Sequence, residues 1–167
     1  MVWAATKLII WDDLYPTYRR VNIEYKGRNP ETVYRYIKRL LLEVFRVPEG
    51  NFQEKNFKWE TSEKGNEFKV EWDAIKPLDN FTYLKIEVRL KGFSSGGVGR
   101  ISLNYRPTIV TEYPQDTFWQ QNILYEMLRR LWHVLFYRRK RNEYFEMGLK
   151  MAHVFEERLK EYIRALS

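Results

Sequence analysis

One stretch governs the fold that we expect for this chain: WHVLFYRRKR, residues 132–141. In it, an apolar helical surface runs directly into four consecutive cations. From Phe118 to Tyr137 the polar residues fall within a narrow arc at about 100° per residue, and almost everything else is apolar. We therefore expect a helix that is buried on most of its circumference, beginning at an N-cap at Asp116 or Thr117.

The length of the C-terminal helical region, residues 116–167, limits its shape. As one straight helix it would extend ~75 Å at ~1.5 Å per residue, several times the ~15 Å radius of gyration of a compact chain of this size. We therefore predict a bend or break near residues 138–142. From Tyr144 to Leu166 the apolar stripe is narrower and heptad-like, so the alternative is that the C-terminal helix pairs with a second copy as a homodimer.

Upstream, apolar and polar residues alternate over several segments, which is typical of strands with one buried face. Residues 18–115 contain one such strand, a helix with Asn29 as N-cap and Pro30 in its first position, and four more strands. We predict an α+β fold: an antiparallel meander of about five strands packed on an N-proximal helix and a long C-terminal helical region. Residues 1–167 are expected to form a single domain, with 1–17 as an N-terminal arm or short strand.

The segment 92–99 is rich in glycine, and its backbone N–H groups are of the kind that can cradle a phosphate. It lacks the lysine and Ser/Thr of a P-loop, and it precedes a strand, whereas a P-loop precedes a helix. We expect it to be a mobile hairpin connection.

The order of elements resembles the helix-grip fold of the START-like, or Bet v 1-like, superfamily. The resemblance covers most of residues 20–167, rests on element order, and contains no signature motif. Members of that superfamily usually have more strands and a pair of short helices after the first strand, and the helical tail here is longer. The resemblance implies that an apolar ligand is held between the sheet and the long helix.

Composition excludes several functions. The chain has no cysteine, which removes disulfides, thiolate nucleophiles and Cys-ligated metals. His133 and His153 are the only histidines, and no nucleophile with a positioned base can be named, so we predict no catalytic residue, no metal and no cofactor, and lean away from an enzyme. No apolar window is long enough for a transmembrane helix, so a cytoplasmic location is expected. Dense Lys, Arg and Glu would suit a thermophile.

Aromatic residues make up 17% of the chain, which admits two interpretations. They either fill the core or line a cavity between sheet and helix, where phenol and indole groups orient an otherwise apolar ligand. The cavity interpretation predicts non-enzymatic binding of an apolar or amphipathic small molecule or lipid. Its candidate residues are Trp59, Trp72, Tyr83, Tyr105, Tyr113, Trp119 and Trp132.

The net charge of +7 permits an anionic partner, and only the run Arg138, Arg139, Lys140 and Arg141 concentrates that charge. A charge run at this position is usually a solvated helix end. The aromatic residues directly upstream favour two other functions for these four side chains: contact with the phosphates of a nucleic acid, or with an anionic membrane.

Overall fold

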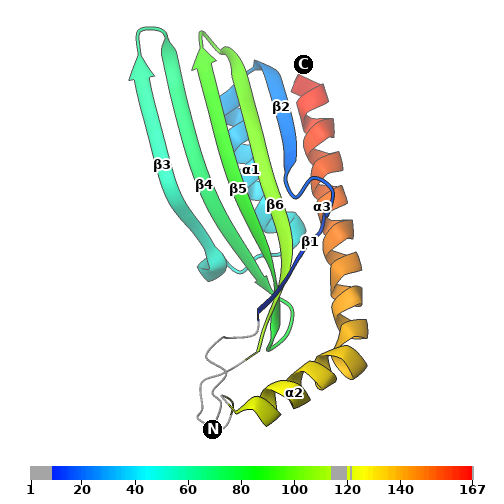
Figure 1. Ribbon diagram of the computed structural model, residues 1–167. Coiled ribbons are helices and arrows are strands. Elements are labelled where there is room, and N and C mark those ends of the chain that lie inside the picture. The colour runs from blue at the N-terminus through cyan, green and yellow to red at the C-terminus, as the bar shows by residue number, and fades with distance from the viewer. Residues whose placement is uncertain (1–8, 114–119, 121, 167) are drawn as a thin grey trace.

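The computed structural model describes residues 9–113, 120 and 122–166. The strands are β1 (Ile9–Asp13), β2 (Val21–Arg28), β3 (Phe52–Ser62), β4 (Gly65–Pro77), β5 (Thr82–Ser95) and β6 (Val98–Glu112). The helices are α1 (Pro30–Phe45), α2 (Ile123–Trp132) and α3 (Arg138–Leu166), with a 3-10 turn η1 (Glu49–Asn51) and a π-helical segment η3 (His133–Tyr137). In the described part of the chain, six strands form one antiparallel sheet that packs against α1 and α3 (Figure 1). The predicted α+β fold class is confirmed.

The sheet has six strands, where about five were expected, because two strands share one side of β6. β6 pairs with β5 along one edge. Along its other edge it pairs with β2 over residues 98–105 and with β1 over residues 108–112. β5 and β6 are joined by a two-residue turn, Gly96–Gly97, whose φ angles of 58° and 80° suit glycine. The glycine-rich segment is therefore mostly strand.

β3 is the opposite edge of the sheet. Its register with β4 shifts at a bulge between Glu54 and Asn56. It also carries Lys55 and Lys58, both well exposed. Bulges and edge lysines discourage pairing with a further strand, so β3 ends the sheet.

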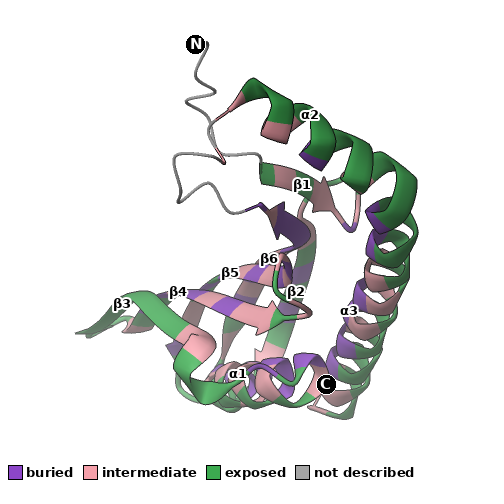
Figure 2. Cartoon of the chain, turned by 90° about the horizontal axis from the view of Figure 1, so that it is seen from below, coloured by how far each residue is buried: buried purple, intermediate pink, exposed green. Residues whose placement is uncertain are grey.

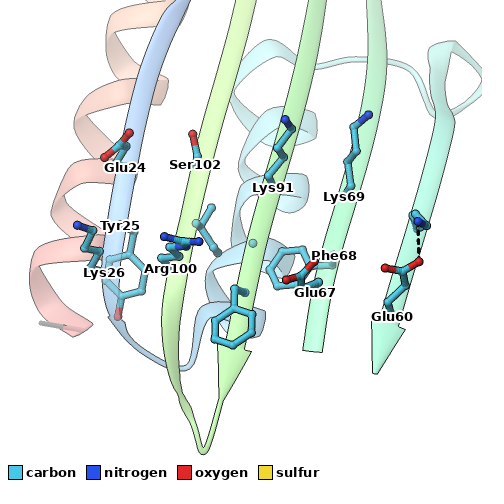
Figure 3. A pocket seen from close by; sticks show the side chains of 14 residues that line it. Glu24, Tyr25, Lys26, Glu60, Glu67, Phe68, Lys69, Lys91, Arg100 and Ser102 are labelled. Atoms are coloured by element: carbon cyan, nitrogen blue, oxygen red, sulfur yellow. Dashed lines mark ion pairs between the residues drawn. The ribbon is translucent and has the colours of Figure 1, made fainter. Parts of the chain in front are cut away.

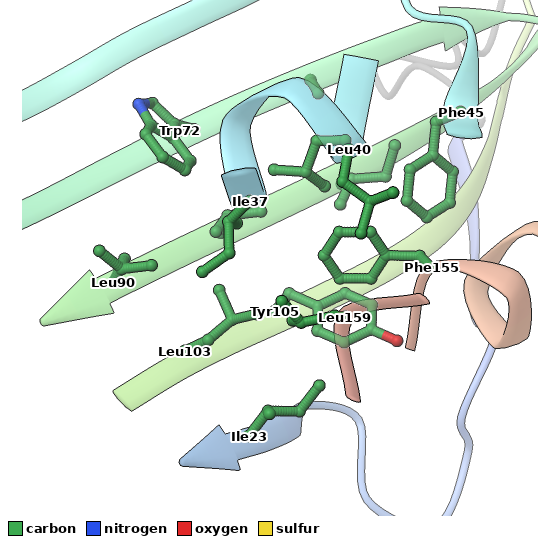
Figure 4. Packing of buried hydrophobic residues seen from close by; sticks show 14 of the residues in the cluster. Ile23, Ile37, Leu40, Phe45, Trp72, Leu90, Leu103, Tyr105, Phe155 and Leu159 are labelled. Carbon is green, nitrogen blue, oxygen red and sulfur yellow. The ribbon is translucent and has the colours of Figure 1, made fainter. Parts of the chain in front are cut away.

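The core lies between the sheet and the two helices α1 and α3 (Figure 4). α1 contributes Ile37, Leu40 and Phe45, and α3 contributes Phe155 and Leu159, all of them buried. Each such side chain stabilises the fold by ~1.5–3 kcal/mol relative to leaving it exposed. The helix predicted from Asn29 and Pro30 thus forms and buries its apolar stripe as expected.

α3 is fixed to the sheet by packing and by a half-buried carboxylate. At Gly148 a Cβ would lie 3.1 Å from Leu14, so glycine permits this close approach. Glu156 accepts hydrogen bonds from the hydroxyls of Tyr105 at 2.5 Å and Tyr15 at 2.7 Å. Burial raises the pKa of Glu156, but these bonds outweigh it and hold the pKa below its ordinary value.

The C-terminal helical region changes direction at η3, between α2 and α3 (Figure 1). This segment, residues 133–137, directly precedes the 138–142 range in which a bend was predicted. A π-helical turn is a known site of helix distortion. The predicted N-cap at Asp116 or Thr117 lies outside the described residues. α2 is capped by Asn122, whose side-chain oxygen accepts from the Leu124 N–H at 3.1 Å.

The expectation that this helix is buried on most of its circumference is wrong. Figure 2 shows exposed residues over most of α2, which stands beyond the end of the sheet. Only Arg129 of α2 is buried. The sheet and α1 offer no surface on the outer side of α2, so its apolar stripe stays in contact with solvent.

Candidate functional site

The most unusual surface of the described molecule is the outward side of α2 and η3. Nine large apolar side chains there, among the described residues, are each between 48% and 66% exposed. They fall on one broad side of the helix at 100° per residue. We call this set the apolar face; it consists of Ile123, Leu124, Met127, Leu128, Leu131, Trp132, Val134, Leu135 and Phe136.

The inward side of the same helix is polar. Arg129, His133 and Tyr137 recur every fourth residue and therefore share one side of the helix. Arg129 is only 5% exposed, and its guanidinium lies 6.0 Å from the ring of Tyr113 and 5.8 Å from that of Tyr125. Its three side-chain nitrogens have no hydrogen-bond partner among the described residues. The helix is thus amphipathic with its polar side turned toward the protein.

Hydrogen bonds hold this polar side to the end of the sheet. The Nδ1 atom of His133 lies 2.8 Å from the hydroxyl of Tyr113. Burial, and then the charge of Arg138, lower the pKa of His133 below its ordinary 6.5. The neutral imidazole is therefore favoured at neutral pH. The hydroxyl of Tyr137 lies 2.6 Å from the hydroxyl of Thr82 and donates to Asp79 at 2.7 Å.

Asp79 is the centre of this attachment. Its Oδ1 atom accepts from the backbone N–H groups of Phe81 and Thr82, both at 2.8 Å, and its Oδ2 atom accepts from Tyr137 and from Tyr144 at 3.0 Å. Burial raises the pKa of Asp79, but the hydrogen bonds outweigh burial and lower it overall. One carboxylate thereby joins the β4–β5 turn, η3 and α3.

The four predicted anion-contact residues do not share one surface. Arg141 is buried; it donates to the Thr111 hydroxyl at 3.0 Å and pairs with Asp12. Burial lowers the pKa of the Arg141 guanidinium. Lys140 lies 3.6 Å from Asp79 and remains half exposed.

Arg138 and Arg139 are exposed and directly follow the apolar face. Arg139 is 3.7 Å from Glu143 across one helical turn, with its side chain 93% exposed. Such an exposed pair contributes little, ~0.3–0.5 kcal/mol. These two arginines are thus available to an anionic partner, whereas Arg141 is part of the fold.

The seven predicted pocket aromatics are also dispersed. Trp72, Tyr105 and Tyr113 are buried, Tyr83 is half-buried, and Trp59 lies at the exposed edge on β3. Trp132 belongs to the apolar face, and Trp119 lies outside the described residues. Several of their polar atoms already have partners within the protein: Trp72 Nε1 donates to Glu54 at 2.8 Å, and the Tyr83 hydroxyl donates to Glu112 at 2.6 Å.

Two open cavities lie together at the β5–β6 hairpin end of the sheet, with volumes of about 570 and 630 Å³. Figure 3 shows the first of them, on the face opposite α1. Of the predicted pocket aromatics, none of the six that the structure describes lines either cavity. In the described residues no helix is both long enough and apolar enough to cross a membrane.

Sequence reasoning found α2 but assigned its sides the wrong way round. The polar arc that contains Arg129 and His133 was taken as the solvent side, whereas the structure turns it inward. One signal pointed the other way: three polar residues that bond His133 or Tyr137 lie near the start of β5 or the end of β6, namely Asp79, Thr82 and Tyr113. Pairing them with the arc requires knowledge of the tertiary fold.

No protein-family model matches the chain, and no curated protein matches it. Among solved structures, a Staphylococcus aureus protein of unknown function aligns with 95% of this chain and 96% of its own, at 14% identity and a TM-score of 0.32. An uncharacterised protein from Rhizobium leguminosarum aligns with 92% of this chain and 99% of its own, at 9% identity and a TM-score of 0.20. Likenesses this weak carry no argument about fold or function.

Proposed function

We propose that this protein attaches peripherally to anionic membranes by laying the apolar face of α2 and η3 into the lipid interface. The single observation that carries the proposal is the orientation of the helix, with nine large apolar side chains outward and its polar side anchored to the sheet. Monomeric soluble proteins rarely expose a contiguous apolar patch of this kind unless it binds something.

The residue types of the apolar face suit a lipid interface. Trp132 and Phe136 lie together on it, with ring centroids 5.0 Å apart, and aromatic side chains of this kind concentrate at the headgroup level. Leucines supply most of the remaining area, and burial of apolar surface contributes ~25 cal/mol per Å². The exposed Arg138 and Arg139 follow within one turn, and each cation near an anionic surface adds ~1 kcal/mol.

Charge favours an anionic lipid surface over a second copy of the chain. Arg129 and Arg141 are buried, so the exposed cations beside the apolar face are Arg130, Arg138, Arg139 and Lys140. Glu126 is already paired with Arg130 at 2.5 Å, and its side chain is only 18% exposed. Glu143 is likewise beside Arg139, at 3.7 Å, so two carboxylates face four exposed cations. A symmetric contact between two apolar faces would therefore bring a net positive charge to the interface, whereas anionic headgroups would neutralise it.

Vesicle flotation tests the proposal. The protein should float with vesicles that contain phosphatidylserine and float less with phosphatidylcholine alone, because the cations contribute to binding. The double variant Leu128→Gln/Leu135→Gln should weaken binding at least tenfold, since ~1.4 kcal/mol of lost apolar burial suffices for that factor. The matched control is Phe57→Gln/Val154→Gln, which removes two exposed apolar side chains from β3 and α3 and should bind like the wild type.

Light scattering, which measures the mass in solution, distinguishes a membrane from a second copy of the chain as the partner of the apolar face. A monomer that binds vesicles supports the proposal. The proposal would be wrong if the protein does not float with vesicles and forms a stable dimer that Leu128→Gln/Leu135→Gln converts to monomer. The apolar face would then bind a second copy of the chain. Binding of an apolar ligand between the sheet and α3 stays a prediction.

A further inference from the structure

The face of the sheet opposite α1 and α3 carries a row of like charges. Lys58 on β3 is directly opposite Lys69 on β4, and Lys69 is directly opposite Lys91 on β5. Figure 3 shows Lys69 and Lys91 side by side on this face. Neighbouring strands are ~4.8 Å apart, so the three side chains emerge from adjacent positions. Like charges directly opposite in a sheet are destabilising. An anion bound over these three ammonium groups would therefore reduce their mutual repulsion.

The protein supplies only part of that negative charge. Lys58 pairs with Glu60 at 2.5 Å and Lys69 with Glu71 at 3.4 Å, each with its neighbour two residues along the same strand. Lys91 makes no ion pair with any residue that the structure describes. It is also exposed, so its ammonium group is available to a ligand.

In the next row of the sheet an aromatic ring lies between two acids, Glu60 and Glu67, and two cations. Phe93 on β5 is opposite Arg100 on β6, and Arg100 is opposite Lys26 on β2. Within residues 9–113, 120 and 122–166, neither Arg100 nor Lys26 has an ion-pair partner. Phe93, Arg100, Lys26 and Glu67 line both of the cavities described above, so the two cavities adjoin around this ring.

The cavity over these rows has the size and chemistry of a ligand site. Its volume of about 570 Å³ is within the ~300–1,000 Å³ of small-molecule sites. Five cations and three carboxylates line it, so its charge is positive. The cations are Lys26, Lys58, Lys69, Lys91 and Arg100, and the carboxylates are Glu24, Glu60 and Glu67.

We propose that this face binds single-stranded nucleic acid, with a base stacked on Phe93 and phosphates held by Lys91, Arg100 and Lys26. An aromatic ring among dispersed cations on an open sheet is the arrangement by which proteins hold unpaired bases and their backbone. Duplex is disfavoured, because its bases are already stacked and cannot reach Phe93. The inference is independent of the membrane proposal, since it uses neither α2 nor the run 138–141.

Fluorescence anisotropy with a labelled single-stranded oligonucleotide of about ten nucleotides tests this site. The protein should bind it, and affinity should fall steeply from about 50 to about 200 mM salt. Lys91→Gln/Arg100→Gln should weaken binding about tenfold or more and make the log–log salt slope shallower by ~1.4, the effect of two lost contacts to a single strand. Lys150→Gln/Arg164→Gln removes the same charge from exposed positions of α3 and should leave both quantities unchanged.

Phe93→Leu separates stacking from charge. It keeps an apolar side chain but removes the aromatic face, and loss of one base–aromatic stack should weaken binding about five- to a hundredfold with an unchanged salt slope. Thermal melting checks that each variant is folded. Mononucleotide and duplex are run as competitors, and the single strand should outcompete both.

Three results would overturn the inference. The first is no binding of the single strand at low salt. The second is equal loss in the two charge variants, which would mean that only net charge matters. The third is binding of anionic vesicles that depends on Lys91 and Arg100 without any binding of the oligonucleotide, which would assign this face to lipid.

Discussion

α1 and α2 are both amphipathic helices, and they place their apolar sides in opposite directions. α1 buries Val33, Ile37 and Leu40 between the sheet and α3, whereas α2 leaves Leu128 and the rest of the apolar face in water. The difference lies in what is next to each helix. α1 runs along the sheet, while α2 lies beyond the end of β6, where only its polar side meets the protein (Figures 1 and 2). Periodicity therefore identifies an apolar side without revealing what covers it.

The sharpest test of this contrast removes one leucine from each helix. Leu40 is 2% exposed and Leu128 is 65% exposed. Leu40→Ala should lower the free energy of unfolding by ~2–5 kcal/mol, because it leaves a cavity in the core. Leu128→Ala should change it by less than about 0.5 kcal/mol. Urea denaturation of both variants measures the two values. Similar losses would mean that the apolar face is covered in the isolated protein.

A smaller effect is expected on the inward side of α2. Arg129→Met should raise the free energy of unfolding by about 1 kcal/mol, because it removes a buried charge without a hydrogen-bond partner among the described residues and keeps an apolar stem of similar length. Arg130→Met is the control. Arg130 is 65% exposed and paired with Glu126, so its loss should matter little. Destabilisation by Arg129→Met would show that its contacts with Tyr113 and Tyr125 outweigh burial of the charge.

The smallest effect concerns pH and the attachment of η3. Because the pKa of His133 is lowered in the folded protein, the unfolded chain binds more protons as pH falls below the ordinary 6.5. The contribution of neutral His133 to the free energy of unfolding is therefore fully present above pH 6.5 and is lost as the pH falls below it. His133→Gln should flatten the fall in melting temperature between neutral and mildly acidic pH. A fall in melting temperature that is as steep in His133→Gln as in the wild type would contradict this assignment.

Most of the fold could be predicted because it depends on local patterns. Alternation along 68–72 and 84–90 indicated strands, and Asn29-Pro30 indicated where α1 begins. β1 was harder to predict, because a strand of five residues is stabilised by its pairing with the far end of β6 and carries little local pattern. The pairing of two strands with one side of β6 is a property of the tertiary fold.

The candidate sites were less predictable for the same reason. Arg141 looked equivalent to Arg138 and Arg139 in the sequence, but its partner Asp12 is distant along the chain, so its burial could not be read from the run itself. The row of Lys58, Lys69 and Lys91 was also invisible, because it exists only once three strands are in register.

The edge strand β3 gives the exposed helix a further meaning. With its bulge between Glu54 and Asn56 and its lysines, β3 is guarded against the edge-to-edge pairing that leads to aggregation. α2 has no comparable guard: no charged side chain interrupts its apolar face. β3 is protected against association, whereas the apolar face is left free to bind a partner. The solubility of the protein should therefore depend on whether that partner, or a detergent in its place, covers the apolar face.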